Sequence, residues 1–203
     1  YAEIFGAFVY GSDKYSDRIN KLLYRLRVLN QTTCYPFLLH VFDDYHQGVI
    51  TEETVEKILQ FILAYLLRRM VCGVPSNTLR GLFTYLYNRI FKVASNKQKY
   101  YETLNKFLFT VSSKDVIPSA AEFERALQKA NIYGNNALCR FPLLDIENGD
   151  GKEILQAENL TIEHIMPQTL SADWSHIRPE EHEEYLHTLG NLSVTGYNSE
   201  LSN

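Results

Sequence analysis

The sequence has few cysteines, and none is placed for a disulfide framework or a zinc ribbon. Cys34, Cys72 and Cys139 are odd in number and widely spaced, and no C-x-x-C pair occurs among the 203 residues. Scattered cysteines of this kind are typical of a reducing compartment. The first residues also lack the charged and apolar regions of a signal peptide. The sequence therefore favours a cytoplasmic location.

Long hydrophobic runs and a phosphate-binding loop are also missing. The longest apolar stretch, Ile58 to Leu67, is about half of the ~20 residues that a membrane span needs. We therefore expect no membrane partner. No G-x-x-x-x-G-K-[ST] motif occurs, so we expect no P-loop nucleotide hydrolysis from these residues.

Basic residues are scarce at one end of the chain. The formal net charge of −4 gives no overall nucleic-acid signature. Residues 1–140, however, hold 18 Lys and Arg against 12 Asp and Glu, whereas residues 141–203 hold 2 against 12. The sequence thus predicts a basic body followed by an acidic C-terminal segment.

Apolar residues recur at helical spacing through the basic body. The clearest helix is predicted between Thr51, a residue suited to capping, and Gly73, a residue suited to ending a helix. We expect a helical domain over residues 1–150, built as a multi-helix bundle, so the fold class is mainly α. Four basic side chains in this domain are candidate contacts to a DNA backbone, with an ordinary solvated helix surface as the alternative: Arg68, Arg69, Arg89 and Lys92.

The pattern changes after residue 158. Residues 160–165 are short, β-branched and alternating, and Pro167 ends them, which predicts a strand. An acidic helix is predicted over 180–188 with Pro179 at its first position, and a second strand over 191–195. We expect Asn198 to begin a helix. We therefore expect a small ββα domain over residues 151–203.

Two motifs in this domain carry a family resemblance. The sequence E-H-I-x-P-Q at 163–168 is followed by L-G-N-L-x-x-T-G-x-N at 189–198. Together they resemble the His-Me finger (HNH) nuclease motif. More closely, they resemble the C-terminal domain of the GmrSD family of modification-dependent (type IV) restriction endonucleases. In that family the helix after Asn198 continues further, so the resemblance implies a finger truncated at its C-terminus and a fragment without full activity.

Phosphodiester hydrolysis needs a base for water and a group that neutralises developing negative charge. An imidazole suits the first role at neutral pH, and a hard divalent cation with oxygen ligands suits the second. The resemblance implies that His164 is the general base and that Asn191 is a catalytic-site residue that orients the finger. It implies Glu163 and Asn198 as ligands of Mg²⁺ or Mn²⁺, with His187 as a further candidate.

The resemblance also implies partners. It predicts a metal-dependent DNA endonuclease in phage defence, acting on DNA that includes modified phage DNA. It further implies an N-terminal nucleotide-hydrolysing domain or subunit that this sequence does not contain.

Two alternatives compete with the nuclease hypothesis. The helices could form a non-catalytic interaction module of a multidomain defence protein, with the finger kept for its fold. A structural zinc site built from His176, His182 and His187 is disfavoured, because these residues have irregular spacing and no cysteine partners.

Overall fold

The computed structural model describes residues 1–111, 114–150, 156 and 160–196. The chain divides into two compact units, a helical unit of Tyr1–Ser119 and a C-terminal unit of Ala120–Asn203. This division differs from the boundary expected after residue 150. The reason is that the two helices between residues 120 and 150 pack with the C-terminal elements.

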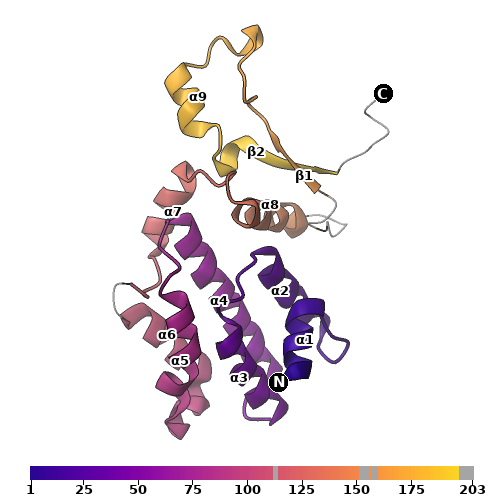
Figure 1. Ribbon diagram of the computed structural model, residues 1–203, viewed down its shortest axis with the longest axis vertical. Coiled ribbons are helices and arrows are strands. Elements are labelled where there is room, and N and C mark those ends of the chain that lie inside the picture. The colour runs from indigo at the N-terminus through magenta and orange to yellow at the C-terminus, as the bar shows by residue number, and fades with distance from the viewer. Residues whose placement is uncertain (112–113, 151–155, 157–159, 197–203) are drawn as a thin grey trace. The chain divides into compact units, whose positions relative to one another are not determined.

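The helical unit is built around its longest helix. α4 packs against α2, α3 and α6, and α5 packs against α3 and α6 (Figure 1). The elements of this unit are α1 (Ala2–Tyr10), α2 (Asp17–Val28), α3 (Tyr35–His46), α4 (Glu52–Val71), α5 (Leu79–Phe91), the 3₁₀ helix η1 (Ala94–Lys99) and α6 (Tyr100–Thr110).

The ends of α4 form as the sequence predicts. The Thr51 hydroxyl accepts a hydrogen bond from the Thr54 backbone N–H at 3.3 Å, which satisfies one free donor of the first turn. Gly73 follows the helix with a φ of 64°, a left-handed conformation that favours glycine. The helix buries apolar side chains on most of its circumference, because neighbouring helices cover it on several sides.

A buried carboxylate joins four elements of the helical unit. Asp44 on α3 is 3% exposed. It accepts hydrogen bonds from Tyr87 of α5 at 2.8 Å and Tyr100 of α6 at 3.0 Å. It also forms an ion pair with Lys97 of η1 at 2.7 Å. A carboxylate that loses its hydration is stable in a core only when such donors replace the water.

A buried cation closes the end of α4. Arg69 is 1% exposed, and its guanidinium donates to the carbonyl oxygens of Lys114 and Pro75, both at 2.9 Å. Its neighbour Arg68 donates to the Pro118 carbonyl at 3.2 Å. These two arginines therefore attach the loops before α5 and after α6 to the end of α4.

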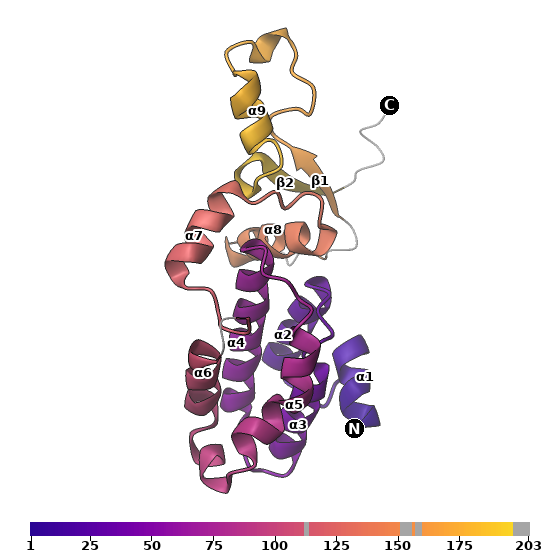
Figure 2. The ribbon, with the colours of Figure 1, turned by 60° about the vertical axis from the view of Figure 1, so that its left-hand side comes forward.

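The C-terminal unit combines helices with a two-stranded antiparallel sheet. β1 and β2 pair so that Ile162 lies opposite Val194 and His164 opposite Leu192. α8 lies beside the two-stranded sheet and packs on β2 (Figures 1 and 2). The elements are α7 (Ala120–Lys129), α8 (Asn136–Asp150), β1 (Leu160–His164), η3 (Ala172–Trp174), α9 (Pro179–Tyr185), η4 (Leu189–Asn191) and β2 (Leu192–Gly196).

The fold class expected from the sequence is confirmed. The described residues are mainly helical, with the small sheet near the C-terminus. Pro179 begins α9, as predicted, because its fixed φ suits the first helical position and its missing N–H costs nothing there. The predicted strands lie within one residue of the observed ones. The helix expected from Asn198 lies outside the described residues. Within the described part of the chain, no helix combines the length and hydrophobicity of a membrane span.

Candidate active site

His164 is the last residue of β1, at the point where the ladder ends. Its partner Leu192 is buried, and the next backbone N–H, of Ile165, donates to the Asn191 carbonyl at 2.9 Å. Two residues later, Pro167 cannot donate to a ladder. The backbone is therefore hydrogen-bonded at His164 and at the next residue, and this fixes the position from which the imidazole projects.

A second histidine holds the His164 ring. His187 follows α9, and its Nδ1 lies 3.1 Å from His164 Nε2. On the other side of the His164 ring, the Gln168 side-chain nitrogen lies 3.4 Å from Nδ1. The two ring nitrogens of His164 are thus in different environments, one in a close contact with an imidazole and one near a longer, weaker contact.

The pKa of His164 lies below its ordinary value. Partial burial disfavours the charged imidazolium, and positive charge on His187 lowers the pKa further, while the Glu163 carboxylate acts in the opposite direction. Neutral imidazole is the form that can accept a proton.

Glu163 precedes His164 in the same strand, and its side chain is exposed. The ladder stays regular through His164, so consecutive side chains point to opposite faces of the sheet. Glu163 therefore shares a face with Ser193, its ladder partner, rather than with His164. Among the residues that the structure describes, no three His, Cys, Asp or Glu side chains converge as a metal site. The expected ligand Asn198 lies outside the described residues.

Asn191 uses its whole side chain to join two segments of the C-terminal unit. It is 7% exposed. Its oxygen accepts from the Met166 backbone N–H at 2.7 Å, and its nitrogen donates to the carbonyls of Met166 at 3.2 Å and Leu186 at 2.8 Å. Asn191 therefore connects the segment after β1 to the end of α9, which lie on either side of the His164–His187 contact.

Tyr133 is a residue of this site that sequence reasoning missed. It lies between α7 and α8, and its ring is 5.1 Å from the His187 ring at an interplanar angle of 7°. The centroid distance to the His164 ring is 4.4 Å, in an edge-on arrangement. The only hint in the sequence is an aromatic residue beside Gly134, in a segment with turn character.

The remaining C-terminal histidines do not join this cluster. His182 Nε2 lies 2.9 Å from the Pro167 carbonyl, so it supports the loop after β1. His176 is exposed and stacks on Trp174 with centroids 5.9 Å apart. In the described ranges, these histidines form no cluster with the spacing of a zinc site.

The candidate DNA contacts in the helical unit have different surroundings. Arg69 is buried and bonded to carbonyl groups, so the expectation that it contacts phosphates is wrong for this residue. Arg68 is partly buried and bonded to Pro118. Arg89 and Lys92 lie exposed on α5 and just after it.

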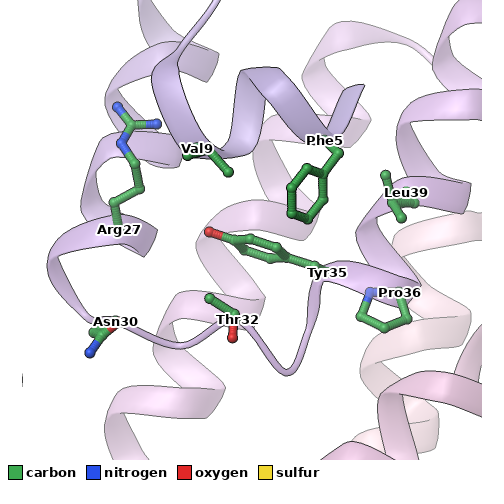
Figure 3. Close-up of a pocket in the computed structure, with 8 residues that line it drawn as sticks. All are labelled: Phe5, Val9, Arg27, Asn30, Thr32, Tyr35, Pro36 and Leu39. Atoms are coloured by element: carbon green, nitrogen blue, oxygen red, sulfur yellow. The ribbon is translucent and has the colours of Figure 1, made fainter. Parts of the chain in front are cut away.

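Two of the open cavities that the described residues line include neither His164 nor His187. One of about 560 Å³ is lined by residues of α1, α2 and α3 in the helical unit, with Tyr35 among them (Figure 3). Its cation, Arg27, already donates to the Phe8 carbonyl at 3.2 Å. The other, of about 840 Å³, lies in the C-terminal unit and is lined by apolar groups that include Met166 and Tyr185. Neither cavity brings together a base and a nucleophile.

A protein-family model matches the C-terminal part of the chain. Residues 117–203 match the model of the family described as GmrSD restriction endonucleases, C-terminal domain. Comparison with curated proteins and with solved structures gave no significant match. The matched residues include the whole His164 site and begin close to the observed division between the two units.

Proposed function

We propose, from the match of residues 117–203 to the C-terminal domain of GmrSD restriction endonucleases, that this chain is a metal-dependent DNA endonuclease with His164 as its general base. The family supports a DNA-acting restriction nuclease, and the His-Me finger chemistry is our more specific assignment. We assign the protein to phage defence in the cytoplasm, because three widely spaced cysteines fit a reducing environment.

The contact between His164 and His187 is the observation that supports this chemistry best. A strand end fixes the base, and one ring nitrogen is held by a neighbouring imidazole at 3.1 Å. The other nitrogen, Nδ1, faces only the longer contact with Gln168 and is the atom that would accept a proton from water. The activated water would then attack phosphorus in the DNA backbone, and the bond from phosphorus to one sugar oxygen would break, so that this oxygen leaves as a hydroxyl group after protonation.

A divalent cation, Mg²⁺ or Mn²⁺, would neutralise charge that develops on the phosphoryl and leaving oxygens. Glu163 supplies an exposed carboxylate on the residue directly before the base, and a carboxylate is a ligand that these ions prefer. Within the described residues, Glu163 lies on the opposite strand face from His164, so the regular strand does not bring this carboxylate to the base.

We further propose that α5 holds the DNA backbone. No Asp or Glu occurs between Glu56 and Glu102, and α5 lies within this segment. The α5 face, defined as Arg89 and Lys92, is exposed, and neither residue has a carboxylate partner among the described residues. Free cations without nearby acidic groups on their own helix are suited to phosphates.

Recognition of modified bases and nucleotide hydrolysis are assigned to a partner domain or subunit. This chain has no P-loop sequence to bind a nucleotide phosphate. Its DNA substrate is therefore expected to include modified phage DNA that the partner selects.

Nicking of supercoiled plasmid and phage DNA tests the proposal directly. The protein is mixed with modified and unmodified DNA in the presence of Mg²⁺ or Mn²⁺, with a chelator as the metal control. We expect His164→Ala to lower the nicking rate about 100-fold or more, because general-base catalysis contributes roughly 10²–10⁴. His176→Ala is the matched control, since His176 is exposed and lies on the loop that carries Trp174.

Equal nicking by wild type and His164→Ala would contradict the nuclease assignment. Retained phage protection in the same variant would instead favour the non-catalytic interaction module. A nicking rate unaffected by the chelator would contradict the metal requirement alone.

A further inference from the structure

The loop between α7 and α8 brings an aromatic ring against both histidines of the candidate site. Tyr133 stacks on His187 and meets His164 edge-on, and the two imidazole centroids are 5.3 Å apart. Three rings from three separate segments of the C-terminal unit thus contact one another pairwise. Tyr133 keeps 37% of its surface exposed, so solvent reaches one side of the cluster.

Backbone hydrogen bonds fix the position of this loop. The Ile132 N–H donates to the carbonyl of His187 at 3.0 Å, and the Ile132 side chain is fully buried. The Asn135 N–H donates to the Ile132 carbonyl at 3.1 Å, and its side-chain oxygen accepts from Leu138 N–H at 3.1 Å in the first turn of α8. Tyr133 is therefore attached to the same residue whose imidazole it covers.

The donors and acceptors around the rings are consistent with one arrangement of protons. The Gln168 amide nitrogen faces His164 Nδ1 at 3.4 Å, and because an amide nitrogen is a donor, this contact favours a lone pair on that atom. A neutral His164 then carries its proton on Nε2 and donates it to His187 Nδ1 at 3.1 Å. His187 in turn carries its proton on Nε2. This order leaves Nδ1 of His164 as the proton acceptor.

We propose that His187 and Tyr133 are positioning residues that hold the base His164 in the tautomer with an unprotonated Nδ1. His187 accepts the Nε2 proton, and Tyr133 fixes the plane of the His187 ring by stacking on it. The inference rests on the proposed nuclease function, because it assigns a role to these residues through His164. It gives His187 a hydrogen-bonding role in place of the expected metal-ligand role.

The ring of Tyr133, rather than its hydroxyl, carries this role. No hydrogen bond to the Tyr133 hydroxyl occurs among the described residues, whereas both ring contacts do. Tyr133→Phe should therefore keep kcat within about twofold, since offset or parallel stacking needs only the aromatic face. Tyr133→Leu should lower kcat about 10-fold, at the low end of the 10–100-fold losses typical for outer-sphere orienting residues.

Steady-state DNA cleavage by wild type and the two Tyr133 variants measures this difference. The loss in Tyr133→Leu should fall on kcat and leave KM within about twofold, because the residue acts on the base and not on substrate binding. Tyr185→Leu is the matched control, since Tyr185 is an exposed tyrosine of the same unit that has no contact with His164. Thermal unfolding of each variant verifies that the fold is kept.

The tautomer can be observed without catalysis. ¹⁵N NMR of the histidine side chains at about pH 8, above the ordinary imidazole pKa, distinguishes a protonated Nε2 from a protonated Nδ1. We expect His164 to be protonated on Nε2 in wild type and in Tyr133→Phe. In His187→Ala and Tyr133→Leu we expect a mixture of the two tautomers.

The outcomes separate this inference from the nuclease assignment. A wild-type His164 protonated on Nδ1, or an unchanged tautomer and an unchanged kcat in Tyr133→Leu, overturns the positioning role. Equal nicking by wild type and His164→Ala overturns the nuclease function, while the NMR result would still decide the proton order.

Discussion

Asp44 should be the most sensitive polar residue of the helical unit. It is 3% exposed and accepts from three groups on three other elements, Lys97, Tyr87 and Tyr100. Replacing it by alanine leaves the ammonium of Lys97, whose side chain is 27% exposed, without its counter-charge, and leaves two hydroxyl groups without their acceptor. Among the elements that would lose their attachment is α5, which carries the proposed DNA-binding face.

The expected loss can be worked out from these contacts. Removing one partner of a buried, hydrogen-bonded ion pair costs about 3–5 kcal/mol, and we expect Asp44→Ala to lower the free energy of unfolding by this amount. Asp44→Asn keeps one acceptor oxygen but loses the charge, so we expect a loss of about 2–3 kcal/mol. The total stability of a domain is about 5–15 kcal/mol, so both losses are large.

Urea unfolding followed by circular dichroism measures these losses. The matched control is Asp43→Ala, the neighbouring carboxylate, which contacts Gln47 at 3.0 Å near the surface. We expect it to lose less than about 1 kcal/mol, as most surface substitutions do. The double variant Asp44→Ala/Lys97→Met should lose less than the two single variants together, because both remove the same ion pair.

A small effect would refute this reasoning. If Asp44→Ala lost less than about 1 kcal/mol, water would have to replace the carboxylate at all three donors, and the network would contribute little. Additive losses in the double variant would show that Asp44 and Lys97 do not stabilise the fold through their shared contact.

Two further predictions concern DNA binding and the loop that carries the base. Replacing Arg89 and Lys92 by Gln should reduce the slope of log Kd against log salt by roughly 1.8, since each phosphate contact contributes about 0.9. Fluorescence anisotropy with duplex DNA, in the presence of a chelator, measures this slope. The control is Lys21→Gln, an exposed position on α2. An unchanged slope would reject α5 as the DNA-binding face. Asn191→Ala should lower the free energy of unfolding of the C-terminal unit by about 2–4 kcal/mol, because buried backbone groups lose their partners. Denaturant unfolding checks this, and a loss under about 0.5 kcal/mol would contradict it.

The sequence alone was sufficient for the helices and strands with strong local signals. Apolar spacing and the Thr51 cap predicted α4, and Pro179 predicted the start of α9. The β-branched runs predicted both strands to within one residue. These signals are local, because capping, proline geometry and side-chain periodicity act over one or two turns. The paired motifs also identified the segment that matches the GmrSD C-terminal domain.

Only the tertiary structure decided which of two chemically similar residues is buried and which is exposed. Arg69 and Arg89 both lie on amphipathic helices, but Arg69 is enclosed by two loops that α4 meets only in the folded unit, whereas Arg89 stays exposed. Tyr133 and His164 are 31 positions apart, and no short-range pattern links them. The boundary at residue 119 was decided in the same way, since α7 contacts η4 and α8 contacts β2. A sequence pattern records which face of an element is apolar, but which partner covers that face depends on how the whole chain packs.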